Sequence, residues 1–142
     1  MITIRKFNKE DAPRVAELIN QLTPNINQPD KLIQRLKGMV EGVNYQYLVV
    51  EMEGLVVGFG GLCWYPISSK GILGWIEEVV IDNKVRGHGL SKELMKHLLK
   101  LAKDRGCQVI KLTTSNPIAR ALYESFGFQT KLESTLMHKK LN

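Results

Sequence analysis

Two adjacent carboxylates, Glu77 and Glu78, interrupt an otherwise apolar stretch, WIEEVVI, at residues 75–81. A carboxylate in such surroundings can accept a proton from a reacting group, which is the task of a general base. The stretch is typical of a buried strand, and adjacent strand residues point to opposite faces of a sheet. We therefore expect at most one of the two to face a reaction site, barring a bulge, with Glu77 the preferred base. The alternative is one exposed glutamate and one glutamate in a structural ion pair.

Two glycines, Gly87 and Gly89, follow shortly afterwards in the sequence VRGHGLSKELM. The first turn of a helix carries unpaired N–H groups and the positive end of the dipole, and glycines placed before it let an anion approach the backbone. Lys84 and Arg86 add positive charge. The stretch does not match GxxxxGK[ST], and Lys92 stands where GxGxxG needs its third glycine, so neither common nucleotide-binding motif is present. Turn chemistry alone is the alternative explanation for the glycines.

Hydrophobic periodicity predicts the elements that must position these residues. Strands are expected at 2–7, 45–52, 55–64, 75–81, 108–114 and 130–141, with a looser stretch at 65–74. Helices are expected after Asn8, from Pro29 to near Gly42, after Gly89 to Gly106, and at 117–126. The succession of strand, glycine loop, helix and strand predicts a parallel crossover, whereas residues 45–64 predict an antiparallel hairpin. We expect one α/β domain over 1–142, with a mixed sheet and helices on both faces.

Two longer patterns carry a resemblance to a known family. Arg86-Gly87-His88-Gly89-Leu90-Ser91 follows the pattern of Gln or Arg, two residues, Gly, one residue, then Gly or Ala, except that Ser91 stands at the last position. The second pattern, Asn-x-x-Ala-x-x-Leu-Tyr-x-x-x-Gly-Phe, is matched by Asn116, Ala119, Leu122, Tyr123, Gly127 and Phe128. On these motifs and their order, the chain resembles the GCN5-related N-acetyltransferases (GNAT) over essentially all 142 residues, and most strongly from 75 to 128.

The resemblance implies a site for acetyl-coenzyme A where two parallel strands, here 75–81 and 108–114, splay apart. It implies that the pyrophosphate lies on the glycine loop, that the pantetheine arm pairs with the backbone of the first strand, and that Asn116 orients this arm. Asn116 can equally be an ordinary helix cap. Ser91 is only slightly larger than alanine, so the phosphate should still fit. The implied cofactor-binding residues are Val79, Val80, Ile81, Arg86, Gly87, His88, Gly89, Leu90, Ser91 and Asn116.

The resemblance also implies an enzyme that moves the acetyl group of acetyl-CoA to a primary amine by direct attack. The acceptor would be a small molecule or a peptide. Glu77 or Glu78 would take the proton of the amine, and Tyr123 would protonate the departing thiolate, unless its ring serves packing alone. The alternative function is a non-catalytic acyl-CoA-binding or sensor domain on the same fold.

The acceptor is not fixed by these motifs. Around residues 75–87 the chain is similar to the glucosamine-6-phosphate N-acetyltransferases, but this local similarity does not carry the substrate over. Determinants of the acceptor are expected in residues 22–29, in residues 62–66 and in the final strand. Three aromatic side chains could line an acceptor pocket or could pack in the core: Trp64, Tyr65 and Trp75.

Charge and composition bound the remaining classes. The net charge is +6, from 20 basic and 14 acidic residues, and the excess is concentrated between Lys84 and Arg105, as expected beside an anionic ligand. A nucleic-acid partner is not expected, because no zinc-finger, helix-turn-helix or aromatic-basic pattern accompanies the charge. The two cysteines and three histidines lack metal-ligand spacing, so we expect no metal, reduced thiols and a cytoplasmic protein. Neither a signal peptide nor a membrane span is expected. The sequence is compatible with a homodimer.

Overall fold

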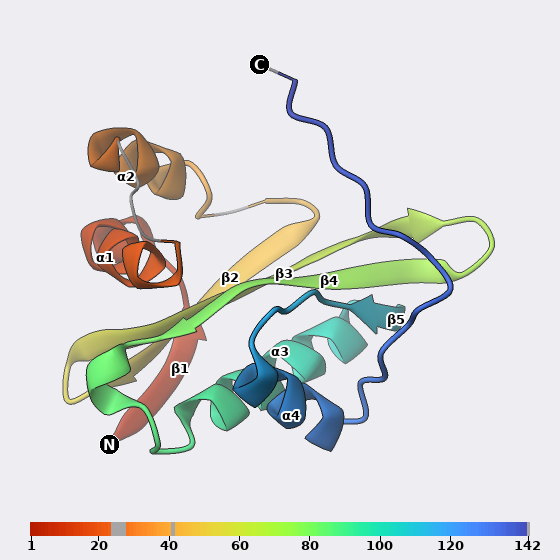
Figure 1. The fold of residues 1–142 in the computed structure, drawn as a ribbon. Coiled ribbons are helices and arrows are strands. Elements are labelled where there is room, and N and C mark those ends of the chain that lie inside the picture. The colour runs from red at the N-terminus through yellow and green to blue at the C-terminus, as the bar shows by residue number, and fades with distance from the viewer. Residues whose placement is uncertain (24–27, 41, 142) are drawn as a thin grey trace. The chain divides into compact units, whose positions relative to one another are not determined.

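The structure is a computed structural model that describes residues 1–23, 28–40 and 42–141. It divides into two compact units, residues 1–112 and 113–142, each described by itself below. The first unit holds a five-stranded sheet in the order β1-β2-β3-β4-β5 (Figure 1). The strands are β1 (Ile2–Lys6), β2 (Tyr45–Met52), β3 (Leu55–Ile67), β4 (Gly71–Ile81) and β5 (Cys107–Lys111).

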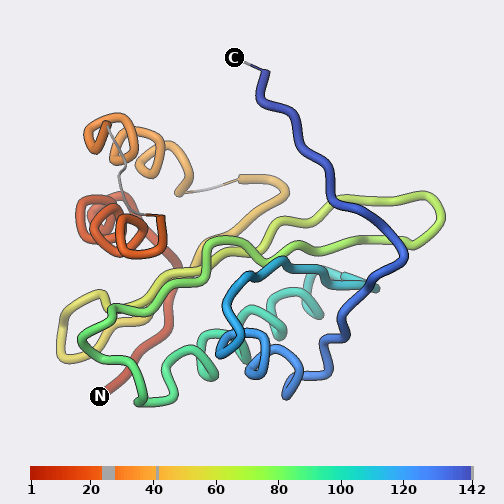
Figure 2. Tube along the Cα trace, in the orientation of Figure 1, coloured from red at the N-terminus to blue at the C-terminus, as the bar shows by residue number. Residues whose placement is uncertain are grey.

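The sheet is mixed, as the sequence predicts. β1 to β4 pair as antiparallel neighbours, and β5 joins β4 in parallel. Helices α1 (Ala12–Leu22) and α2 (Pro29–Lys37) lie on one face, and α3 (Leu90–Asp104) lies on the other. The tube in Figure 2 shows how α3 connects β4 to β5, which is the predicted parallel crossover.

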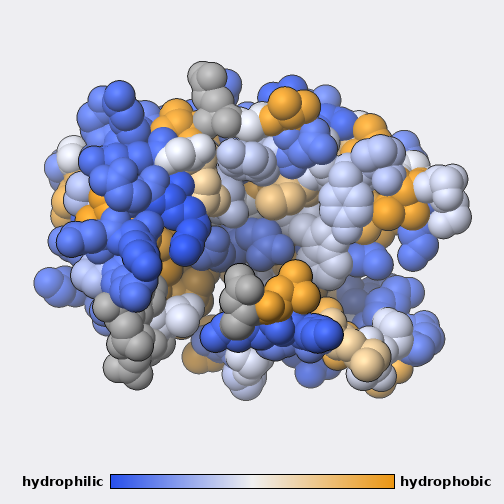
Figure 3. All heavy atoms as spheres, turned by 90° about the horizontal axis from the view of Figure 1, so that it is seen from above, coloured by the Kyte–Doolittle hydropathy of each residue, from blue (hydrophilic) through white to orange (hydrophobic). Residues whose placement is uncertain are grey.

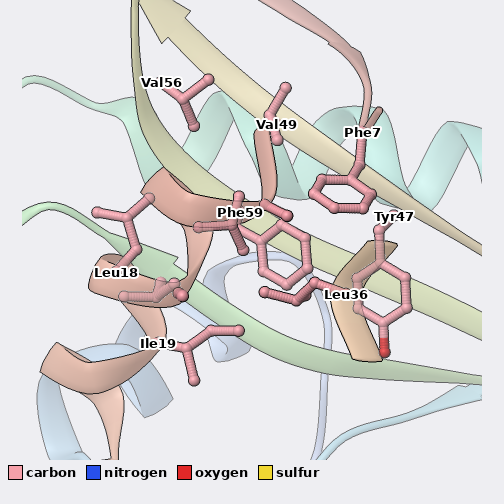
Figure 4. Packing of buried hydrophobic residues seen from close by; sticks show 12 residues of the cluster. Phe7, Leu18, Ile19, Leu36, Tyr47, Val49, Val56 and Phe59 are labelled. Carbon is pink, nitrogen blue, oxygen red and sulfur yellow. The ribbon is translucent and has the colours of Figure 1, made fainter. Parts of the chain in front are cut away.

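The core on the α1 face is built around aromatic rings (Figure 4). The ring of Tyr47 stacks on Phe59, with centroids 4.9 Å apart, and Phe7 meets Phe59 edge-on at 5.6 Å. Gly61 of β3 makes room for this arrangement, because a Cβ there would lie 2.3 Å from the Tyr47 ring. In Figure 4 the hydroxyl oxygen of Tyr47 points away from the other two rings.

The opposite face of the sheet is covered by the apolar side of α3. Leu90, Leu94 and Leu98 recur every four residues and are each at most 2% exposed, as expected for one stripe of an amphipathic helix. Gly60 of β3 lies beneath this stripe, where an added Cβ would meet Leu94 at 3.2 Å. The long helix is therefore seated directly on β3 and β4, and its first turn is fixed beside the end of β4.

Several of the predicted elements differ from the structure. The strand predicted at 108–114 ends at Lys111. Residues 65–74 are not loose: β3 and β4 continue through them as a hairpin, with Tyr65 opposite Leu73. Helix α2 ends at Lys37, well before Gly42, because the chain turns at residues 38–40.

The expected strand at 130–141 is wrong. In the second unit, α4 (Pro117–Ser125) is followed by irregular backbone, and described residues 130–141 contain no strand. Leu132 and Leu136 are 86% and 77% exposed. The weak alternation of the segment is not sufficient, since a strand also needs a neighbour for its backbone groups.

Candidate active site

The site begins where β4 and β5 part. Their parallel pairing runs from Ile72 opposite Cys107 to Trp75 opposite Lys111 and then ends. Beyond it, residues 76–81 of β4 have β3 as their only strand neighbour among the described residues. The other edge of this segment therefore presents backbone N–H and C=O groups that an extended ligand can pair with. This parting of the two strands corresponds to the opening that the family resemblance implies.

A β-bulge lies in the middle of this free edge. Phe59 pairs with Val80 and Gly61 pairs with Glu77, so that Glu78 and Val79 together stand opposite Gly60. Glu78 has a φ of 53°, in the left-handed region that non-glycine residues seldom occupy. Bulges re-aim side chains and recur beside active sites.

The bulge brings both glutamates to the same side of the sheet. Glu77 pairs with Gly61, which faces the Tyr47 ring on the α1 side, whereas Val79 faces α3 beside Gly60. Glu78 stands between them and lines a pocket together with residues of α1 and α2. In a regular strand Glu77 and Glu78 would point to opposite faces of the sheet. This expectation from the sequence excepted a bulge, and the structure contains one.

The pocket has a volume of about 500 Å³ and lies between β4 and the two helices of this face. Its lining is mixed, consisting of Ile19, Thr23, Gln28, Lys31, Leu32, Arg35 and Glu78. Figure 3 shows that the surface over α1 and α2 is mainly hydrophilic, with smaller apolar areas. A cavity of this size and composition suits a small polar ligand.

The electrostatics of the pocket single out Glu78. Although the Glu78 residue is exposed, partial desolvation of its carboxyl at the pocket wall raises the pKa above its usual value, and the nearby Glu77 raises it further, while Arg35 acts in the opposite direction. The pKa of the Tyr47 hydroxyl is raised by burial and then by Glu78. Glu78, Glu77 and Tyr47 therefore form one electrostatic group. A carboxylate with a raised pKa is a stronger base than an ordinary glutamate.

The glycine loop lies at the other end of the free edge. Gly87 and Gly89 have φ values of 89° and 72°, and an added Cβ at either position would meet nothing within 4 Å. Glycine is thus needed for the backbone conformation, and the space beside it is open. Gly89 is the N-cap of α3 and makes no side-chain cap, so the first-turn N–H groups of this helix face that space. Arg86 lies close by, with its Nε 3.4 Å from the carbonyl oxygen of Ile81.

Asp82 anchors this loop to the rest of the first unit. Its buried carboxylate accepts hydrogen bonds from Arg14 Nη2 at 2.5 Å, Gln21 Nε2 at 3.3 Å and the Lys84 backbone N–H at 3.1 Å. Its own N–H donates to the carbonyl of Val57. These contacts, led by the bond from Lys84, lower the pKa of Asp82. The short 3-10 turn η2 (Asn83–Val85), which leads into the glycines, is therefore held in a fixed position.

The residues expected to bind the cofactor occupy this edge and loop in different ways. The side chains of Val80, Ile81 and Leu90 are buried, that of Val80 in the core on the α1 face, so their backbone alone can face a ligand. His88 is exposed and Ser91 is partly exposed in the first turn of α3.

Asn116 and Tyr123 belong to the second unit. The Asn116 side-chain oxygen accepts hydrogen bonds from the N–H groups of Ile118 at 2.9 Å and Ala119 at 3.3 Å, so it caps α4. The ring of Tyr123 packs edge-on against Phe128, with centroids 6.1 Å apart, and burial raises the pKa of its hydroxyl. This hydroxyl stays protonated at neutral pH and can act as a proton donor.

The aromatic side chains named as pocket candidates lie elsewhere. Trp75 donates its indole N–H to the Tyr65 hydroxyl at 3.0 Å, and Trp64 packs under Arg105 with a ring distance of 5.2 Å. None of the three lines the pocket beside Glu78. Of the expected specificity loop at 22–29, residues 24–27 lie outside the described residues, and Thr23 and Gln28 at its two ends line the pocket.

Sequence reasoning missed the two cations of this pocket, Lys31 and Arg35. Their spacing of four residues on a predicted helix was the available signal, because such residues share one face. Within the described parts of the chain, no helix is long and apolar enough to cross a membrane. Nor do residues 1–23, 28–40 and 42–141 hold a group of three or more His, Cys, Asp or Glu side chains arranged to bind a metal ion.

Comparisons with known proteins bear on the fold and the family. A glucosamine 6-phosphate N-acetyltransferase from Trypanosoma brucei brucei is 35% identical over 78 residues, covering 54% of this chain and 52% of that protein, so the match spans about half of that relative. A crystal structure of glucosamine-6-phosphate N-acetyltransferase from Arabidopsis thaliana matches with a TM-score of 0.82 and 27% identity, covering 100% of this chain and 99% of the other.

Two further matches bear on the fold and the family. The fold is shared with a predicted acetyltransferase from Clostridium acetobutylicum solved with acetyl-CoA, at a TM-score of 0.80 and 19% identity, covering 97% and 96% of the two chains. The model of the Acetyltransferase (GNAT) family matches residues 12–128. The chain therefore belongs to the GNAT family of acetyltransferases.

Proposed function

We propose that this GNAT acetyltransferase binds acetyl-CoA along the free edge of β4 and transfers the acetyl group to a primary amine held beside Glu78. The observation that carries the proposal is the parting of β4 from β5 after Trp75, which leaves residues 76–81 open between the glycine loop and the pocket. One continuous edge thus connects a site for phosphate with a site for a small polar acceptor.

The residues present fit acetyl-CoA. The open space beside Gly87 and Gly89 and the unpaired N–H groups of α3 suit a pyrophosphate, and Arg86 adds a cation. The backbone groups of Val79, Val80 and Ile81 that are not bonded to β3 or to Arg86 suit the amide groups of a pantetheine arm, which can pair with them as an added strand would. Acetyl-CoA would supply a thioester, whose carbonyl carbon is open to attack by an amine.

The protein's contribution to the chemistry is proton transfer and positioning. An alkylammonium with a pKa near 10 has no free lone pair, so a base must first take its proton. Glu78 is the favoured base, because it lines the pocket and its pKa is raised, and Glu77 is the alternative. Direct attack then forms the C–N bond and breaks the C–S bond. Tyr123 is proposed to give its proton to the departing thiolate.

Glucosamine 6-phosphate is one candidate acceptor, because two of the similar proteins are named glucosamine 6-phosphate N-acetyltransferases. The test is a panel of amines with acetyl-CoA, in which release of the free thiol and the mass of the acetylated product are both followed. The panel spans sugar amines including glucosamine 6-phosphate, amino acids, polyamines and peptide lysines. Thiol release that depends on an amine supports an enzyme, whereas tight acetyl-CoA binding without thiol release from any amine supports the sensor alternative. The cytoplasmic location and the homodimer stay predictions of the sequence.

A further inference from the structure

The pocket beside Glu78 is lined by two cationic side chains that have no part in the proposed proton transfer. Lys31 and Arg35, one helical turn apart on α2, both line it with exposed side chains, and Glu78 is the one acidic residue among the lining residues that the structure describes. Neither Lys31 nor Arg35 takes part in any of the ion pairs of 4.0 Å or less between described residues. Arg35 lies near enough to lower the pKa of Glu78, yet no salt bridge joins the two.

This charge pattern discriminates between classes of amine. A polyamine would bring further positive charges against an ammonium and a guanidinium, which is unfavourable. A neutral amino sugar would leave both exposed cations to water and would gain no attraction from them. A compound that carries a phosphate or carboxylate in addition to its amine would give the cations their partner, and a guanidinium binds such groups with two parallel hydrogen bonds.

We propose that the acceptor is a small amine that also bears an anionic group, and that Lys31 and Arg35 bind this anion while the amine faces Glu78. The proposal rests on the proposed acetyl transfer and names the class of its acceptor. The volume of about 500 Å³ limits the acceptor to a small molecule or to the end of a chain. Thr23 and Gln28 supply neutral hydrogen-bonding groups at the same wall.

Matched pairs of amines test the proposal. Ethanolamine is compared with O-phosphoethanolamine, and 1,5-diaminopentane with lysine, so that each pair differs by one phosphate or one carboxylate. We expect the anionic member to have a kcat/KM at least about tenfold higher, mainly through a lower KM, which corresponds to one charge-assisted contact. The two pairs also distinguish a preference for phosphate from a preference for carboxylate.

Variants then assign the preference to residues. In Arg35→Gln and in Lys31→Gln the ratio of kcat/KM between the members of a pair should fall toward one, whereas Lys37→Gln, on the same helix but outside the pocket lining, should keep the wild-type ratio. Melting temperature and acetyl-CoA affinity, measured by calorimetry, check that each variant is folded. Equal ratios in wild type and all three variants, or a wild-type preference for the uncharged or polycationic amine, overturns the proposal while leaving acetyl transfer intact. No acetylation of any amine overturns the transfer itself.

Discussion

Glu78 of β4 stands opposite Gly60 of β3 within a bulge, and this single irregularity turns Glu78 toward the pocket between β4, α1 and α2. In a regular strand Glu78 would point toward α3, where Leu94 and Leu98 fill the space near Gly60. The left-handed φ of 53° at Glu78 is the conformational cost of this placement. A strained residue with a raised pKa beside a pocket is a candidate for chemistry.

Replacing Glu78 with glutamine tests its role as the base. Glu78→Gln should lower kcat/KM at neutral pH by roughly 10²–10⁴-fold, the usual contribution of a general base. Part of the rate should return at high pH, where the amine loses its proton to water. In the wild type the rate should fall as the pH drops through the pKa of Glu78, which lies above its ordinary 4.5. A pH–rate profile of each protein supplies the measurement.

Glu77→Gln is the matched control for this experiment. It removes the neighbouring charge that raises the pKa of Glu78, so the acid limb of the profile should move to lower pH while the rate at neutral pH is largely retained. If Glu77→Gln is instead the variant that loses the rate, the base is Glu77. Two wild-type profiles would remove both carboxylates from the mechanism.

A bulky residue at Gly89 should weaken acetyl-CoA binding without unfolding the chain. Gly54, in the turn between β2 and β3, gives a matched control, because it has a φ of 78° and equally open surroundings. Gly89→Val and Gly54→Val should therefore lose similar stability, roughly 1–2 kcal/mol for the left-handed conformation. Only Gly89→Val should raise the Kd for acetyl-CoA in calorimetry. Equal affinities in the two variants would assign the glycine to turn geometry alone.

Asp82 should stabilise the glycine loop in a pH-dependent way. Asp82→Asn removes the charge that meets Arg14 and should lower the free energy of unfolding by roughly 2 kcal/mol at neutral pH. The pKa of Asp82 is lower in the folded state than in the unfolded chain, so this stability is present above about pH 4 and is lost as the pH falls through the folded pKa. Urea unfolding of both proteins at several pH values should show the difference shrinking toward acid pH. A constant difference would exclude this ionisation as its source.

Tyr123→Phe keeps the ring that packs on Phe128 and removes the hydroxyl. We expect kcat to fall at least about tenfold, with acetyl-CoA affinity and melting temperature nearly unchanged. Tyr65→Phe, which loses a hydrogen bond from Trp75 instead, is the control and should leave kcat at the wild-type value. Turnover of Tyr123→Phe at the wild-type rate, with chemistry shown to be rate-limiting, would make Tyr123 a packing residue and water the proton donor.

Much of the fold follows from local pattern. β2 was predicted over the residues it occupies, 45–52, because its sequence YQYLVVEM is rich in aromatic and aliphatic residues. The stretch 65–74 and the segment 130–141 were misread for one reason: whether a polar segment becomes a strand depends on a neighbour that lies far away in sequence. Tyr65 finds such a neighbour in Leu73, whereas residues 130–141 are not paired in the described structure.

The parts of the site that depend on local backbone conformation could be predicted from the sequence. The parts that depend on the register between β3 and β4 could not. Gly87 and Gly89 predicted the open loop, since few other residues adopt φ values near 72° and 89°. The bulge gave a weaker signal, the glycine pair Gly60-Gly61 opposite the two glutamates, which indicates crowding on both faces of β3. Predicting that the cations of α2 line the pocket would have required knowing how this helix packs over β4. No local sequence pattern encodes that packing.

The central claim, that acetyl-CoA lies along the free edge of β4, is tested most directly by a crystal structure with a non-hydrolysable acetyl-CoA analogue. The account predicts pyrophosphate oxygens within hydrogen-bond distance of backbone N–H groups in residues 87–92, a pantetheine arm paired with the backbone of 79–81, and the acyl group on the side of Glu78. An analogue bound with its pyrophosphate away from this loop, or with its pantetheine arm away from β4, would contradict it.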